Sequence, residues 1–117
     1  MDPEPMTEEA IKALIIKSRD EMNVEQKRLW DVIQIEPEKW QRGPWSDATN
    51  GFWAVATIGK TVIWYNEIEE GFNQSSFKTF GEIGEYWCNQ DELRHVTQQI
   101  MYEIHGTDPT TPSRAIT

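Results

Sequence analysis

The stretch NEIEEGFN, from Asn66 to Asn73, crowds carboxylates and amides together directly after an apolar run. Oxygen ligands at this density would suit a hard cation such as calcium, which takes about six to eight of them, or would supply an acid and a base. The spacing departs from the calcium-loop pattern, because Ile68 stands where a ligand is expected. Nothing in the stretch separates the environments of Glu69 and Glu70, as an acid and base pair requires. The sequence therefore favours a solvated turn with an acidic rim.

Cys88 and His95 are a second pair with possible chemistry, since they flank the expected start of a helix. The positive end of a helix dipole favours a thiolate, and the imidazole lies within two turns. However, Cys88 stands where a hydrophobic staple with Leu93 would bury it, and His95 projects away from the apolar stripe. Neither histidine has a second metal ligand at helical spacing, and there is one cysteine. We therefore predict no catalytic residue, no metal and no cofactor.

Aromatic side chains are the third candidate, because the 117 residues include six tryptophans. The apolar runs Phe52–Ile58 and Thr61–Asn66 predict a β-hairpin with a two-residue turn that needs glycine first, at Gly59. The register that follows pairs Ile58 with Thr61, Ala56 with Ile63, Val55 with Trp64 and Trp53 with Asn66.

Both faces of this predicted hairpin are apolar. One has alanines at its centre, which lets a helix approach closely, and we expect it to meet the helices: Phe52, Ala54, Ala56, Ile58, Ile63 and Tyr65. The other consists of Trp53, Val55, Thr57, Val62, Trp64 and Asn66. The helices of a small domain cover one sheet face. The other face therefore needs cover from the loop with Trp40 and Trp45, from a second copy of the chain or from another protein.

Helices are expected on both sides of the hairpin in the sequence. Thr7 and the Asn23–Gln26 pair are capping signals for two consecutive helices, or for one helix kinked at Asn23, and Pro37 prevents continuation. Residues 40–51 read as a connection, the polar run 73–76 as a turn and residues 77–83 as a third strand. An Asn89–Glu92 capping box predicts the last helix, which Gly106 ends.

The sequence thus predicts one α+β domain over residues 7–105, with a three-stranded or four-stranded antiparallel sheet. The N-terminal helices and the C-terminal helix are expected to pack on one face of that sheet. Residues 1–6 and 106–117 contain prolines and polar residues and are expected to be flexible tails.

The net charge of the chain limits the classes of partner that it can bind. The formal charge is -9, and the span from Thr61 to Glu103 contains two cations against eight carboxylates. Such a field repels nucleic acids and anionic lipid and attracts a basic protein, although it also serves simply to keep the domain in solution. No apolar run approaches a membrane span and no secretion signal is recognisable, so we expect a cytoplasmic protein with neither membrane nor nucleic-acid contacts.

The leading functional expectation is a non-catalytic protein-binding module of the bacterial cytosol. Its contact surface would be the aromatic sheet face with its acidic rim: Trp53, Val55, Val62, Trp64, Glu67, Glu69 and Glu70. The partner would be a protein, basic in character, or a second copy of the chain. In general character, such a small, acidic, aromatic-rich domain is similar to immunity proteins that neutralise basic toxin nucleases, or to adaptors.

The alternative is a small enzyme or a ligand-binding protein. Its pocket would lie between the sheet and the Trp40–Trp45 loop, and the candidate residues are Trp40, Trp45, Asn66 and Asn73.

Overall fold

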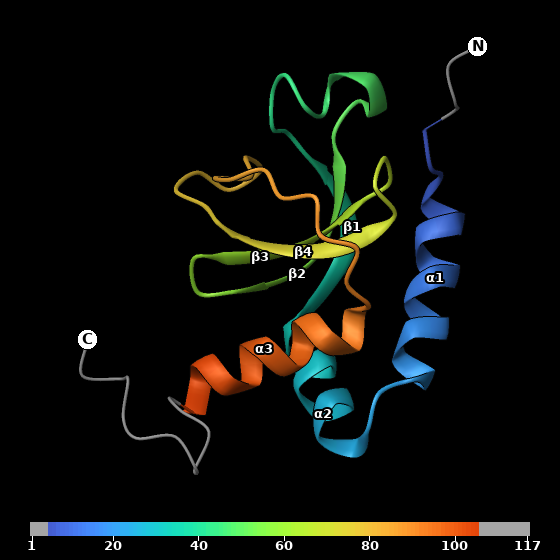
Figure 1. The fold of residues 1–117 in the computed structure, drawn as a ribbon, viewed down its shortest axis with the longest axis vertical. Helices are drawn as coiled ribbons and strands as arrows, with labels where there is room; N and C mark the ends of the chain where they lie inside the picture. Colours follow the sequence, from blue (N-terminus) through green and yellow to red (C-terminus); the bar gives the residue numbers. More distant parts are fainter. Residues whose placement is uncertain (1–4, 106–117) are drawn as a thin grey trace.

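Three helices and four strands make up this computed structural model, which describes residues 5–105. The elements are α1 (Glu8–Asp20), α2 (Val24–Ile33), β1 (Gln34–Trp40), the short 3-10 helix η1 (Asp47–Thr49), β2 (Phe52–Ile58), β3 (Thr61–Asn66), β4 (Gly71–Ser76) and α3 (Leu93–His105). The strands form one antiparallel sheet in the order β1-β2-β3-β4 (Figure 1). The predicted α+β fold, with N-terminal and C-terminal helices and a three-stranded or four-stranded antiparallel sheet, is confirmed, and the sheet has four strands.

The two N-terminal helices begin where the capping residues predict. The Thr7 hydroxyl accepts a hydrogen bond from the amide three residues on, and Asn23 and Gln26 form a reciprocal capping box. This box separates α1 from α2 as two helices. Arg19 then joins them, because its guanidinium donates two hydrogen bonds to Asp31, of 2.8 and 2.7 Å, which lower the pKa of that carboxyl.

The predicted start of the last helix is wrong. Helix α3 begins at Leu93, and the backbone of Asn89 is engaged with the Asn73 side chain instead of opening a helix. Cys88 is exposed, so it does not pack as a hydrophobic staple. The predicted stop at Gly106 lies outside the described residues.

All three helices pack against one face of the sheet. The core on that side consists of Ile11, Met22, Trp30, Ile33, Trp53, Val55, Ala56, Ile63, Tyr65, Phe72, Leu93, Val96 and Ile100. In Figure 1, α1 stands beside the sheet, whereas α2 and α3 lie below it. The prediction that the helices share one face is therefore confirmed.

A β-bulge at Val55 changes which residues of β2 meet the helices. The predicted pairs Ile58–Thr61 and Ala56–Ile63 are present, but beyond them Ala54 pairs with Trp64, and Trp53 with Tyr65. The extra residue inverts the first half of β2 relative to simple alternation.

The bulge corrects the predicted faces. Trp53 and Val55 lie on the helical side, while Phe52 and Ala54 lie on the opposite side with Val62 and Trp64. Trp53 and Trp64 therefore point to opposite faces of the sheet, and the prediction that they share one face is wrong.

The face opposite the helices is covered by the chain between β4 and α3. Its core consists of Trp40, Phe52, Ala54, Val62, Trp64, Phe77 and Ile83, with Ile35 and Tyr86 packed against it. Phe77, Ile83 and Tyr86 all come from the segment that returns from β4 towards α3, drawn in yellow to orange in Figure 1. Residues 77–83, predicted as a strand, thus form an apolar cover over the sheet.

Two strands were missed by the sequence prediction. β1 contains Pro37, which lies in the irregular part of its pairing with β2, at the edge of the sheet where a proline is tolerated. β4 has a polar sequence, GFNQSS, which reads as a turn. It is a strand because hydrogen bonds satisfy its buried side chains: Ser75 accepts from the Trp64 indole, and the Asn73 side chain bonds to the chain at Asn89.

Candidate functional site

The predicted aromatic contact face is not a surface of this protein. Val55, Val62 and Trp64 are fully buried, and Trp53 is 9% exposed on the helical side. The Trp53 indole donates a hydrogen bond to the carbonyl of Met6, which ties down a residue that the sequence placed in a tail. These four side chains stabilise the core and are not available to a partner.

The acidic stretch after β3 closes the β3–β4 connection. The Asn66 side chain accepts hydrogen bonds from the amides of Ile68 and Glu69, which is an Asx turn, and Glu70 adopts a left-handed backbone with φ of 58°. Glu67 turns inward: one oxygen accepts from the Met6 amide at 2.6 Å and the other lies 3.7 Å from a lysine, Lys39.

The remaining pocket candidates are separated from one another. Trp40 is fully buried and donates to the Glu38 carboxylate, whereas Trp45 is 51% exposed and stacks on Tyr86 at 4.7 Å between ring centroids. Asn66 is buried, and its amide donates to the Tyr86 hydroxyl and to a main-chain carbonyl. Of the four candidates, Asn73 alone lines a hollow that combines several functional groups.

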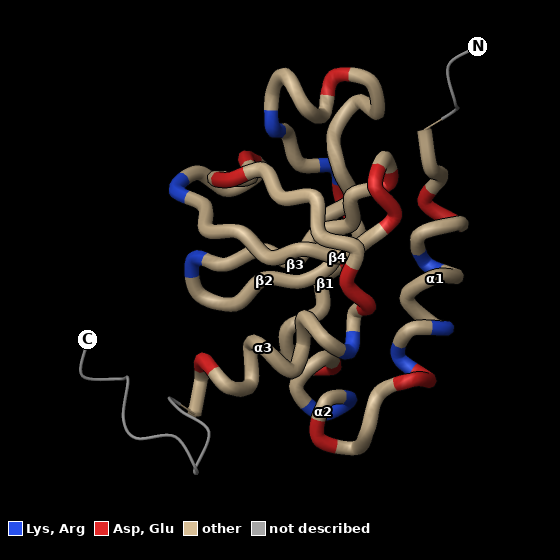
Figure 2. Tube along the Cα trace, in the orientation of Figure 1, with Lys and Arg blue, Asp and Glu red and all other residues tan. Residues whose placement is uncertain are grey.

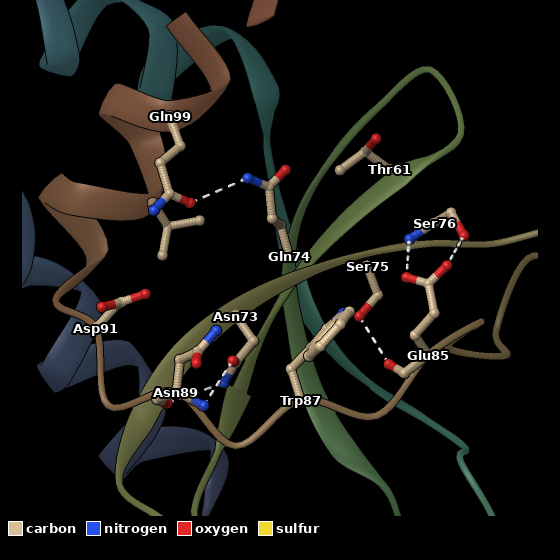
Figure 3. A pocket seen from close by; sticks show the side chains of 11 residues that line it. Thr61, Asn73, Gln74, Ser75, Ser76, Glu85, Trp87, Asn89, Asp91 and Gln99 are labelled. Carbon is tan, nitrogen blue, oxygen red and sulfur yellow. Dashed lines mark hydrogen bonds between the residues drawn. The ribbon is translucent and has the colours of Figure 1, made fainter. Parts of the chain in front are cut away.

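That hollow lies at the outer edge of β4, between this strand, the returning chain and α3 (Figure 3). We call it the β4 hollow; its volume is about 360 Å³. Trp87 stands on one side of it, and Asp91 and Gln99 on the other. It is lined by Thr61, Asn73, Gln74, Ser75, Ser76, Glu85, Trp87, Asn89, Asp91, Val96 and Gln99.

Two glycines bring the returning chain against β4 at the two ends of the hollow. A Cβ on Gly71 would lie 2.2 Å from the carbonyl oxygen of Asn89, and one on Gly84 would lie 2.3 Å from that of Ser76. Only glycine permits such approaches without displacing the backbone. Between these two contacts the chain stands away from the strand, with Ser75 and Asn73 holding it through hydrogen bonds to the main chain of Glu85 and Asn89.

The edge of β4 is open at one residue, Gln74. Antiparallel pairing turns the main-chain groups of alternate residues away from β3. The Phe72 amide donates to the Asp91 carbonyl, and Ser76 bonds outward through both its amide and its carbonyl. Gln74 has the same orientation as these two. Within residues 5–105, nothing bonds to its main-chain N–H or C=O.

The lining of the β4 hollow is acidic. It includes Glu85 and Asp91 and, among the described residues, no lysine, arginine or histidine. The Ser76 hydroxyl and, to lesser extents, the Ser76 amide, the Trp87 indole and Arg42 hold the pKa of Glu85 below its usual range. Figure 2 shows acidic segments on both flanks of β4: the turn between β3 and β4, and the stretch leading into α3.

A second hollow, of about 660 Å³, lies next to the predicted Trp40–Trp45 pocket. Residues 41–43 form one side and residues 76–79 and 82–85 the other. Neither tryptophan is part of its lining, because Trp40 is buried in the core and Trp45 stacks on Tyr86.

Comparisons with known proteins find no family model, curated protein or solved structure that matches this chain. Within residues 5–105 there is no group of three or more metal-ligating side chains, and no helix there is long and apolar enough to cross a bilayer.

Sequence reasoning missed the residues that make the β4 hollow a site. Gln74 contributes its main chain, which carries no sequence signal. Gln99 reaches the hollow because α3 packs beside β4, and Asp91 because its main chain pairs with Phe72. Trp87 received no role from the sequence, although it is half exposed and tryptophan is a residue that concentrates binding energy at interfaces.

Proposed function

We propose that this chain is a non-catalytic protein-binding module of the cytosol whose contact surface is the β4 hollow with Trp87. The partner is another protein, basic in character, rather than a nucleic acid or a membrane. The observation that carries this proposal is the open position of β4 at Gln74, flanked by an exposed tryptophan and by carboxylates.

Three properties of the surface support this proposal. Unpaired strand edges pair readily with other polypeptides. Tryptophan concentrates binding energy at protein interfaces, and Trp87 is 47% exposed. A net charge of -9 favours the approach of a basic partner, and repels nucleic acids and anionic lipid. The cytosol is included because Cys88 is a free, exposed thiol, which suits a reducing compartment.

The hollow beside the Trp40–Trp45 loop gives less support to an enzyme or a small-ligand protein. Neither tryptophan lines it, so the aromatic wall that this alternative required is not part of that hollow.

The proposal is tested by retaining partner proteins from the source cell on the immobilised full chain. We expect Trp87→Ala to retain the partner about tenfold less than the wild type, because truncating a central interface tryptophan costs about 1–2 kcal/mol or more. Identification by mass spectrometry and sizing of the wild type would show whether the partner is another protein or a second copy.

Trp45→Ala is the matched control for that experiment. Trp45 exposes a similar fraction, 51%, but does not line the β4 hollow. Equal retention by the wild type, Trp87→Ala and Trp45→Ala would contradict the proposal, provided that circular dichroism shows all three to be folded.

A further inference from the structure

The open edge of β4 is too short to accept a continuing strand. The returning chain closes the edge at Phe72 through the Asp91 carbonyl, and at Ser76 through Gly84 and Glu85. Gln74 alone, between them, presents a free donor and a free acceptor. A polypeptide that pairs here does so at one residue and must leave the edge on both sides, as the tip of a loop does.

The small volume of the hollow agrees with an occupant that pairs with β4 at one residue. Its volume of about 360 Å³ lies near the lower end of ligand sites, which span roughly 300–1,000 Å³. Hydrogen bonds hold the chain that bounds it at Asn89 and Glu85, so the opening is formed before a partner arrives.

The charges in the hollow indicate which side chain the bound loop tip should carry. Glu85 is already engaged by Ser76, whereas the Asp91 carboxylate makes no hydrogen bond or ion pair with any residue in the described part of the chain. No cation lines the hollow within that part. An arginine or lysine of a partner would supply the missing positive charge, and Trp87 offers a ring beside it, whereas the Gln99 amide oxygen already accepts a hydrogen bond from the Gln74 side chain.

We propose that the β4 hollow binds the tip of a basic loop of a partner protein, with one residue pairing its main chain with Gln74 and an arginine or lysine side chain meeting Asp91. This inference rests on the proposed function and names the chemistry of its partner.

The experiment uses a capped single residue as the probe. The full chain, labelled with nitrogen-15, is titrated with N-acetyl-arginine N-methylamide and followed by amide chemical shifts. The neutral, nearly isosteric citrulline derivative is the matched probe. We expect the Gln74 amide to shift, with dissociation on the order of millimolar for so small a ligand. The citrulline probe should bind about threefold more weakly or worse, because it lacks the charge that Asp91 attracts.

Two substitutions at one position separate the main chain from the side chain. Gln74→Pro removes the outward N–H, which has no partner to lose within the sheet, at an edge position where proline is tolerated. Gln74→Ala keeps that N–H. We expect Gln74→Ala to bind the arginine probe and Gln74→Pro to lose binding at least tenfold. Equal binding by the two variants would overturn the inference.

Asp91→Asn provides a test that does not depend on the folding of the proline variant. It should lower the affinity for the arginine probe to that of the citrulline probe and leave the citrulline probe unaffected. Equal affinities of the two probes for the wild type would overturn the inference. If neither probe shifts Gln74 while Trp87→Ala still loses a partner protein, this inference fails and the proposed function stands. If Trp87→Ala loses no partner, the proposed function itself fails.

Discussion

At the scale of single residues, Asn66 and Glu67 act as internal ties within the fold. Glu67 joins Met6 and Lys39, and Asn66 orders the turn that follows β3. Their crowding in the sequence suggests a site, but in the fold each faces a different partner. Such partners stabilise buried polar groups, because an unpaired one would cost about 1–3 kcal/mol, and one Glu67 oxygen has the Lys39 charge near it in place of a hydrogen bond.

Glu85 gives a prediction about pH. Its pKa is held below the ordinary value of 4.5, chiefly by the Ser76 hydroxyl, so its ionised form stabilises the folded state above that pH. The contribution is lost as the pH falls through the lowered pKa. We expect Glu85→Gln to lower the free energy of unfolding near pH 7 by at most about 1 kcal/mol, since the group is partly exposed.

Urea unfolding of the wild type and Glu85→Gln, from about pH 7 to about pH 3, measures this effect. The difference between the two proteins should narrow with acidification. A constant difference across that range would mean that the charge of Glu85 does not contribute.

At the scale of elements, the sequence predicted what local signals specify. The starts of α1 and α2 follow from the side chains of Thr7 and Asn23, and the hairpin turn follows from Gly59, whose φ is 57°. The α+β class and the β2–β3 hairpin followed from these together with the apolar patterns, whereas β1 and β4 did not.

The errors have physical causes that local patterns do not contain. Strict alternation along β2 fails because Val55 is bulged, and one extra residue moves Trp53 to the other face. β4 was missed because tertiary hydrogen bonds, rather than apolar side chains, stabilise it. The β4 hollow could not be predicted from the sequence. It depends on the distance between β4 and the segment that returns from β4 to α3, and the close contacts at Gly71 and Gly84 fix where this segment meets β4.

The close contact at Gly71 gives a prediction for an element boundary. Gly71→Ala places a methyl group 2.2 Å from the carbonyl oxygen of Asn89, so the chain must move away from β4. We expect the free energy of unfolding to fall by about 2 kcal/mol or more, as for other overpacked sites.

Gly59→Asn is the control for this prediction. Gly59 has a positive φ but no atom within 4 Å of an added Cβ, and asparagine tolerates the left-handed region. The free energy of unfolding of Gly59→Asn, measured like that of Gly71→Ala by urea unfolding, should fall by less than about 1 kcal/mol. Similar losses for both variants would contradict the role given to close packing at Gly71.

At the scale of the whole molecule, one chain covers both faces of its sheet. The helices cover one face and the segment between β4 and α3 covers the other. No second copy is needed to bury the tryptophans of the sheet. The acidic excess is then a property of the outer surface, where like charges repel one another.

This excess predicts a response to salt. Raising sodium chloride from about 0.02 M to about 0.5 M should raise the Tm, because screening reduces repulsion among the carboxylates. In the double variant Glu21→Gln/Glu82→Gln, which removes two exposed charges that form no ion pair within the described residues, the gain should be smaller. Differential scanning calorimetry measures both, and an unchanged or lower Tm of the wild type in salt would contradict this account.

The two-sided covering also sets an order for synthesis. The β2–β3 hairpin leaves the ribosome before Phe77, Ile83 and Tyr86, which shield its outer side in the finished fold. Until those residues emerge, a nascent chain exposes Phe52, Val62 and Trp64 to its surroundings. Stable folding during translation must therefore wait until most of the chain has been synthesised. Before that point the exposed apolar side chains make the nascent chain a substrate for chaperones.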